Sequence, residues 1–385
     1  MNPFQFSTVP HLIADSGATA QLGAIIKERF PQVRTALVVT DAGFLRTGLL
    51  AGPIANLRHH GIAVHTYSEV VADPPEAVVL DAVARARATE ADLIIGFGGG
   101  SSMDVAKLIA VLAASDQPIA EIYGIGNVRG ARLPLVQIPT TAGTGSEVTN
   151  IAIVTTGATT KTGVVAAQLY ADLAILDASL TLGLPPLVTA ATAIDAMVHA
   201  IEATTSRHKK NLLSDSLAKQ ALQLLSHNLL LVCKHGDNLD ARQAMLVGAC
   251  LAGQAFSNAP VAAVHALAYP VGGIFHVPHG LSNALVLPHV LRFNLSHATA
   301  QYAELAAIVA PHASGSEEAR ANALIVAMQQ IASQSGISTR LSEVGIGEAD
   351  LDGLADAAML QTRLLGNNPR TVSWHDARAI YAAAL

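Results

Sequence analysis

The stretch Leu93-Ile-Ile-Gly-Phe-Gly-Gly-Gly-Ser-Ser-Met-Asp104 decides the fold. Its first five residues are almost all apolar, which is typical of a β-strand that is buried on both faces. Three glycines follow, and Ser101 is placed to cap a helix that runs to about Ala114. Because glycine has no Cβ and the first N–H groups of a helix are free, such a turn can hold a diphosphate. A tight turn without a ligand is the alternative.

The same alternation of strand and helix continues on both sides of this unit. Further apolar strands are expected at 35–40, 62–67 and 135–138, and helices at 51–60 and around 78–83. Alternating strands and helices predict a parallel sheet that is covered by helices on both faces.

The chain changes character at Gly183-Leu-Pro-Pro186, because paired prolines interrupt regular structure. Helical periodicity dominates beyond this point, with long helices expected at 212–232, 239–256 and 317–334. We therefore expect an α/β dinucleotide-binding domain over residues 1–184 and an all-α metal-binding domain over residues 185–385.

Composition excludes several classes of protein. Hydrophobic residues make up 51% of the 385 residues and charged residues 14%, so the chain is not a disordered polymer. A net charge of -6 leaves no basic excess for nucleic acid. The two cysteines, Cys233 and Cys250, form no disulfide framework, and the first residues lack the basic region of a signal peptide. These features favour a cytoplasmic protein.

One segment is long and apolar enough to cross a bilayer. Residues 243–275 contain no Asp, Glu, Lys or Arg. They do contain Gln254, Asn258, Pro260, His265 and Pro270, a set that a lipid-facing helix tolerates badly. We therefore expect helices that are buried in the protein core, with polar atoms directed at a site, and no membrane partner.

Two further loops are candidates for binding a dinucleotide. Asp41 follows the strand at 35–40, at the edge where open parallel sheets bind ligands. Its carboxylate there would accept from ribose hydroxyls and repel a 2′-phosphate, which favours NAD over NADP; a plain turn residue is the alternative. Pro139-Thr-Thr-Ala-Gly-Thr-Gly-Ser-Glu147 follows another strand, and its hydroxyl and N–H groups can bind phosphate and ribose. An ordinary Ser/Thr-rich loop is the alternative there.

A carboxylate and three imidazoles in the second half suggest a metal site. Asp195 and His199 are four residues apart in a helical pattern, so both side chains lie on one helix face. His265 and His279 follow further on. One oxygen ligand and three nitrogen ligands suit Fe²⁺ or Zn²⁺, although structural roles for the histidines are the alternative.

Taken in order along nearly the whole chain, these motifs resemble the iron-containing (group III) alcohol dehydrogenases. The resemblance implies the two-domain fold of the dehydroquinate synthase-like superfamily. It also implies hydride transfer between a small alcohol or aldehyde and NAD, and usually a homodimer. It makes Asp195, His199, His265 and His279 the catalytic metal ligands, with Fe²⁺ expected and Zn²⁺ as the alternative. Asn150 and Phe256 would lie near the nicotinamide or the substrate. The cofactor contacts that it implies come from Asp41, Asp73, Gly98, Gly99, Gly100, Ser101, Asp104, Thr140, Thr141, Thr144, Ser146 and Lys161.

The chain departs from the family pattern at a few positions. Tyr269 stands where some members carry a second histidine near the nicotinamide, so it is expected to shape the substrate pocket. Asp73-Pro74-Pro75 replaces a Pro-Asn-Pro, and His276 is an additional imidazole before His279. Four alternatives stay open: a glycerol dehydrogenase-like polyol oxidation, a maleylacetate reductase-like activity, a dehydroquinate synthase-like lyase and a nucleotide-binding protein without catalysis.

Overall fold

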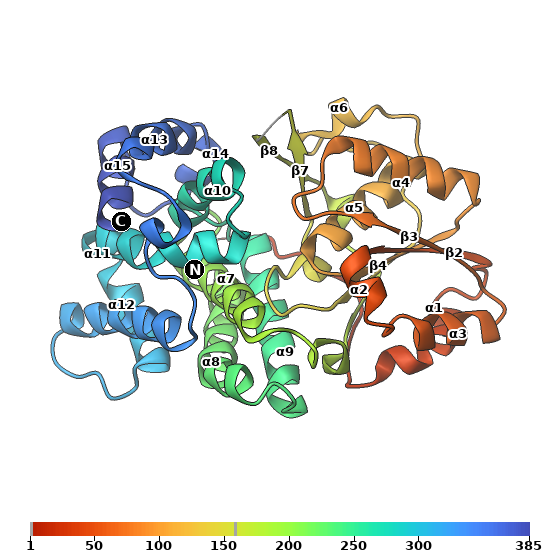
Figure 1. Ribbon diagram of the computed structural model, residues 1–385, viewed down its shortest axis with the longest axis horizontal. Coiled ribbons are helices and arrows are strands. Elements are labelled where there is room, and N and C mark those ends of the chain that lie inside the picture. Colours follow the sequence, from red (N-terminus) through yellow and green to blue (C-terminus); the bar gives the residue numbers. More distant parts are fainter. Residues whose placement is uncertain (1–2, 158–159) are drawn as a thin grey trace. The chain divides into compact units, whose positions relative to one another are not determined.

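The structure is a computed structural model that describes residues 3–157 and 160–385. The described residues divide into two units (Figure 1). The first unit holds residues 8–141 and 145–182. The second holds residues 183–385 together with the N-terminal residues up to Ser7 and the short segment Ala142–Thr144.

The first unit is built on a parallel sheet, which confirms the expected α/β class. Within the described residues its six strands lie in the order β1-β9-β6-β4-β2-β3, and every pairing is parallel. The chain passes from β2 outward to β3 and then returns to β4 on the other side of β2. This reversal is the position at which parallel α/β sheets bind their ligands. The strands are β1 (Leu12–Ala14), β2 (Thr35–Asp41), β3 (Ala63–Val70), β4 (Leu93–Gly98), β6 (Leu135–Pro139) and β9 (Leu173–Leu176).

Helices cover both faces of this sheet. Figure 1 shows α4 and α5 on one side and α1 and α3 on the other. All six residues of β4 are buried, as an apolar strand between two helix layers should be. The helices of this unit are α1 (Leu22–Arg29), α2 (Ala42–Arg46), α3 (Ala51–His59), α4 (Glu76–Ala88), α5 (Gly100–Ala113) and α6 (Ile119–Ile122), with short 3₁₀ turns at Ala18–Gln21, Ser146–Val148, Ala167–Leu169 and Ala178–Thr181.

A second, smaller sheet was not expected from the sequence. It consists of β5 (Gly124–Ile125), β7 (Ile151–Thr156) and β8 (Thr160–Val165), in the order β5-β8-β7. β7 and β8 are antiparallel, and β5 runs parallel to β8. The expected strands and helices of the larger sheet are confirmed within a few residues at their ends.

The second unit is helical, as expected. Its helices are α7 (Pro186–Thr205), α8 (Leu212–Lys234), α9 (Leu239–Asn258), α10 (Ala263–Phe275), α11 (His279–Val309), α12 (Glu317–Gln334), α13 (Leu351–Met359), α14 (Thr362–Leu365) and α15 (Trp374–Ala383), with 3₁₀ turns at Leu341–Val344 and Glu348–Asp350. α7 packs against α8, α9 and α11 and is buried along most of its length. Proline at its first turn starts the helix without the loss of a hydrogen bond.

The uncharged segment 243–275 forms two buried helices, as expected. α9 and α10 meet at a bend of 108°. Among the described residues, α7 is the helix long and apolar enough by itself to span a membrane, and the pair α9 and α10 passes the same test as one bent span. The apolar window of α7 is 78% buried within the protein, as in the core helix of a globular protein.

Candidate metal centre and cofactor loops

The glycine run joins β4 to α5, and no side chain caps the start of this helix. The expectation that Ser101 caps the helix is wrong, because the cap residue is Gly99 and no side chain accepts a bond there. A Cβ on Gly98 would lie 2.7 Å from Ser102 Oγ, so the fold itself needs glycine at that position. A Cβ on Gly99 would meet nothing closer than Thr141 Oγ1 at 3.7 Å. Free N–H groups beside open space are what a phosphate requires.

The position of Asp41 is compatible both with a turn residue and with a carboxylate that binds ribose. It ends β2, and its Oδ1 accepts the N–H of Phe44 at 2.8 Å, which caps α2. Its Oδ2 lies 3.8 Å from the place that a Cβ on Gly98 would take. One carboxylate oxygen therefore holds the turn, while the other lies beside the glycine loop, where the ribose of a bound dinucleotide is expected.

The second loop is tied to the first by a buried lysine that the sequence analysis missed. Lys107 Nζ donates to Ser146 Oγ at 2.8 Å, Thr149 Oγ1 at 3.0 Å and the carbonyl of Ile151 at 2.7 Å. Its side chain is fully buried, and this burial lowers the pKa of the amine. The sequence feature that could have identified Lys107 is its position as a single cation in the otherwise apolar middle of α5.

Asp104 completes this network. Its Oδ1 accepts from Ser146 Oγ at 2.6 Å, and its Oδ2 accepts the N–H of Ile153 at 2.9 Å. Asp104 and Ser146 were both expected to contact the cofactor, and in the structure they contact each other. Their visible role is to fix the second loop against α5.

Glu147 makes the stability of this unit depend on pH. Burial raises the pKa of its carboxyl from 4.5 to about 7. A carboxyl with a raised pKa binds its proton more tightly in the folded state, so its contribution to stability falls as pH rises from about 4.5 to about 7. We expect Glu147→Gln to have the same melting temperature as the parent protein near pH 4.5 and a higher melting temperature above about pH 7. Melting curves at both pH values check this; a Tm difference that does not change with pH would contradict it.

The other expected cofactor residues lie in several places. Thr140 donates its N–H to the carbonyl of Gly98 at 3.0 Å, which places Thr140 and Thr141 beside the glycine loop. Asp73 and Lys161 form an ion pair that joins the turn after β3 to the β7–β8 hairpin. Gly100 and Ser101 form the first turn of α5, and Thr144 belongs to the helical unit. Asn150, which is expected near the nicotinamide or the substrate, accepts the N–H of Ala166 with its carbonyl.

The four expected metal ligands converge on one carboxylate oxygen. Asp195 Oδ1 lies 3.8 Å from Nε2 of His199, 3.6 Å from Nε2 of His265 and 3.5 Å from Nε2 of His279. In Asp195, His265 and His279, one ligand atom each lies within 4.8 Å of the others, and His199 falls outside this tighter group. Three helices supply the set: α7 carries Asp195 and His199, α10 carries His265, and α11 begins at His279.

The proposed ligands shift one another's pKa values. Burial opposes the charge of Asp195, but the imidazoles, above all His199, hold the pKa of this carboxyl well below its usual range. Burial lowers the pKa of His199 to about 3, so this imidazole is neutral with a free nitrogen lone pair. Burial lowers the pKa of His265, but hydrogen bonds to Asp195 and Glu202 raise it to about 9. One carboxylate oxygen and three imidazole nitrogens form a donor set that fits divalent iron or zinc once that proton is displaced.

Glu202 is a further member of the site that the sequence analysis did not select. Its Oε2 lies 2.7 Å from His265 Nδ1, and its carboxylate also accepts the N–H groups of Ala262 at 2.9 Å and Val264 at 2.7 Å. A carboxylate on Nδ1 keeps the proton there and turns Nε2 toward the ligand set. The available signal was its place on α7, seven residues after Asp195 and thus on the same helix face.

We expect Glu202→Gln to weaken divalent metal binding by about 10- to 100-fold, because loss of such a partner frees the orientation of the ligand histidine. Competition with a chromophoric chelator measures the dissociation constant. Unchanged affinity in a folded Glu202→Gln protein would show that His265 needs no such support.

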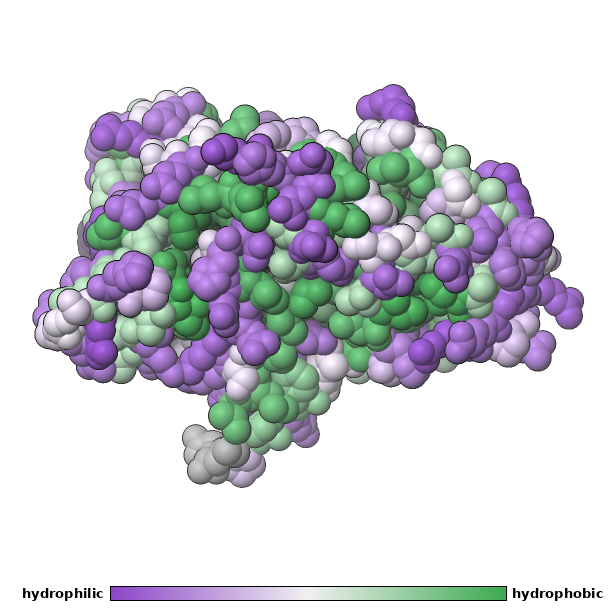
Figure 2. All heavy atoms as spheres, turned by 90° about the horizontal axis from the view of Figure 1, so that it is seen from below, coloured by the Kyte–Doolittle hydropathy of each residue, from purple (hydrophilic) through white to green (hydrophobic). Residues whose placement is uncertain are grey.

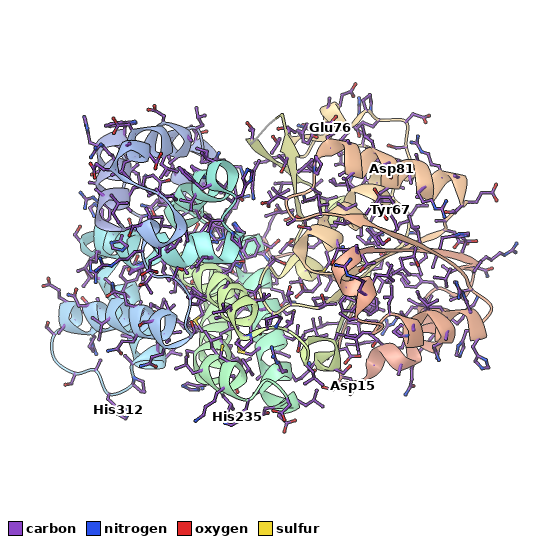
Figure 3. All side chains as sticks on the ribbon, viewed as in Figure 1. Asp15, Tyr67, Glu76, Asp81, His235 and His312 are labelled. Atoms are coloured by element: carbon purple, nitrogen blue, oxygen red, sulfur yellow. The ribbon has the colours of Figure 1, made fainter. Side chains whose placement is uncertain are left out.

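Aromatic side chains line the ligand set. The Phe256 ring stacks on His199 with ring centres 4.2 Å apart, and the Tyr269 ring lies 5.8 Å from that of His279. His276 ends α10 in a left-handed conformation, with φ of 55°, and is exposed. Figure 3 labels two other histidines of this unit, His235 and His312, and both lie at its outer edge, away from the ligand helices.

Comparison with known proteins agrees with this geometry. Residues 10–178 match the family model described as iron-containing alcohol dehydrogenase. Residues 189–385 match the model described as the C-terminal part of the Fe-containing alcohol dehydrogenase family.

Similar proteins span nearly the full chain. A long-chain-alcohol dehydrogenase of Geobacillus thermodenitrificans is 43% identical over 352 residues, which cover 90% of this chain and 89% of that protein. An NAD-dependent methanol dehydrogenase of Bacillus methanolicus is 33% identical over 382 residues, which cover 99% of each chain. A crystal structure of a 1,3-propanediol oxidoreductase superposes with a TM-score of 0.95 at 32% identity and covers 100% of both chains.

Proposed function

The chain belongs to the iron-containing alcohol dehydrogenase family, and on that premise we propose that it oxidises small, uncharged primary alcohols with NAD and reduces the matching aldehydes. It is an oxidoreductase, and NAD and iron are the cofactors of the family. The observation that carries the proposal is the convergence of three imidazole nitrogens on Asp195 Oδ1.

A divalent cation held by Asp195, His265 and His279, with His199 as a fourth ligand, supplies Lewis-acid polarisation of an alcohol or aldehyde oxygen, and NAD supplies the hydride acceptor. Residues of this chain hold the metal ligands in place. Glu202 orients His265, and Phe256 packs against His199. Asp195, His199 and His265 are buried, which limits the access of water to their ligand atoms.

The ligand helices favour an uncharged substrate. Neither α7 nor α10 contains a lysine or arginine. The arginine of α11, Arg292, lies thirteen residues after His279 and donates to Gln329 Oε1 at the surface. A substrate with a phosphate or carboxylate group would need such a cation to offset the cost of its burial. This absence separates the proposal from a lyase that acts on phosphorylated acids.

Asp41 is proposed to select NAD over NADP. Its Oδ2 lies beside the glycine loop, and a carboxylate there repels a 2′-phosphate. We expect Asp41→Gly to reduce the ratio of kcat/KM for NAD to that for NADP by about tenfold or more, as loss of one charge repulsion of about 1.4 kcal/mol would. Steady-state kinetics with both cofactors measure this ratio. A parent enzyme that prefers NADP would contradict the assignment.

A substrate panel tests the proposed function. Metal-loaded protein is mixed with NAD and primary alcohols of increasing length, with diols and with glycerol, and formation of NADH is followed by absorbance. We expect turnover of small monoalcohols or diols, and the reverse reaction with aldehydes and NADH. Protein that binds NAD and metal but oxidises none of these alcohols would support a nucleotide-binding protein without catalysis.

We also propose that the protein is a cytoplasmic homodimer. Figure 2 shows hydrophobic residues among the hydrophilic ones on the face that it draws. Leu187, Leu212 and Leu360 expose more than half of their surface, as residues that an assembly covers often do in the single chain. Light scattering after size exclusion measures the assembly, and a monomer at micromolar concentration would contradict it.

A further inference from the structure

A buried asparagine lies among the proposed metal ligands. Asn283 is fully buried on α11. Its Nδ2 donates to Asp195 Oδ1 at 2.6 Å, which is the same oxygen that the three imidazoles face. It also lies 3.2 Å from Nε2 of His279 and 3.4 Å from Nε2 of His265. One amide nitrogen therefore contacts three of the four ligand side chains.

Helix geometry explains how Asn283 reaches this place. It follows His279 by four residues, so the two side chains lie one above the other on the same face of α11. Among the described residues, its own Oδ1 is buried and has no hydrogen-bond partner. Asn283 thus leaves one polar atom unsatisfied at a cost in stability, while its N–H groups serve the ligand set.

The amide suits the task of holding Asp195. A carboxylate oxygen has two lone pairs and can accept an N–H while it also binds a cation. An amide keeps both of its N–H donors at any pH, whereas a given imidazole nitrogen donates only when it carries the proton. The bond from Asn283 therefore holds Asp195 Oδ1 before a metal binds, so that the ion meets a ligand atom that is already in place.

We propose that Asn283 is a positioning residue that holds Asp195 Oδ1 for the metal ion and thereby raises the affinity of the site. The inference rests on the proposed metal site of this enzyme. Partners of this kind change metal affinity by about 10- to 100-fold when they are removed. Asn283 acts through Asp195 and is not itself assigned a contact with substrate.

The test compares two buried asparagines of the same helix. Asn283→Leu removes the N–H donors and keeps the number and branching of the side-chain heavy atoms. Asn294→Leu is the matched control, because Asn294 is also buried on α11 but donates to Asn368 Oδ1. The dissociation constant for Zn²⁺ is measured on metal-free protein by chelator competition, and melting of the metal-free proteins reports any general loss of stability. Asn283→Ser is a second, smaller change in case the leucine variant does not fold.

We expect Asn283→Leu to bind Zn²⁺ about 10- to 100-fold more weakly than the parent protein. The Zn²⁺ dissociation constant of Asn294→Leu should be close to that of the parent protein. Asn283→Ser should weaken binding in the same direction. Affinity equal to or tighter than that of the parent protein in either Asn283 variant would overturn the role. If the parent protein itself binds no Zn²⁺ or Fe²⁺, the proposed metal-dependent function fails, which is a different result.

Discussion

Replacing His279 by alanine is expected to lower kcat/KM for alcohol oxidation by about a thousandfold or more and to abolish metal retention. Its Nε2 lies 3.5 Å from Asp195 Oδ1, in the group of three whose ligand atoms are closest together. A Lewis-acid metal contributes several kcal/mol to the transition state, and about 4 kcal/mol corresponds to a thousandfold in rate. Metal analysis and steady-state kinetics on the same preparation measure both effects.

The fold should survive this substitution. The His279 side chain is 30% exposed, so its truncation leaves no closed cavity. His276→Ala is the matched control, because this imidazole lies three residues earlier and is exposed. We expect the control to keep its metal and its activity. A His279→Ala protein that is free of metal and turns over at the parent rate would end the assignment of His279 as a ligand.

Replacing Lys107 by methionine is expected to destabilise the first unit by about 3–5 kcal/mol, since it breaks a buried charged network and leaves Asp104 without its cation. For a unit of this size, that corresponds to a fall in Tm of roughly 10 °C. NAD binding should weaken as well, because Lys107 holds Ser146 and with it the second loop. Thermal unfolding and NAD titration below the transition measure these two effects.

A surface lysine provides the control for the loss of stability in Lys107→Met. Lys219 pairs with Glu304, and the side chains are 32% and 58% exposed. Exposed ion pairs contribute about 0–1 kcal/mol, so Lys219→Met should melt close to the parent protein. Equal Tm values for Lys107→Met and Lys219→Met would show that the buried network adds no stability.

The sequence predicted the parts of the fold whose patterns are local. The run Leu93–Phe97 is buried on both faces and reads as a strand without any tertiary information. The β7–β8 hairpin escaped notice because the apolar run of β7 is only four residues long and ends in two threonines, while β8 begins with Thr-Lys-Thr-Gly and is mostly half-buried. Ser101 was assigned as the cap because serine favours that position, whereas the structure places Gly99 there and leaves the N–H groups free.

The residues of the candidate site also fall into those that the sequence predicted and those that it did not. Asp195, His199, His265 and His279 could be selected by residue type and by the resemblance of their motifs. Glu202, Lys107 and Asn283 could not, because each acts through contacts with residues that are distant in sequence, such as the bond from Asn283 to Asp195, 88 residues away. Residue types that bind metals are recognisable alone, whereas the groups that orient them are recognisable only once the chain has folded.

Stepwise return of iron to metal-free protein shows whether alcohol oxidation depends on the metal. Fe²⁺ is added without oxygen, and the rate of alcohol-dependent NADH formation is recorded after each addition. We expect a negligible rate at the start, a linear rise and a plateau at one ion per chain, with no rise in His279→Ala. Full alcohol oxidation before any iron or other divalent metal is added would contradict this expectation.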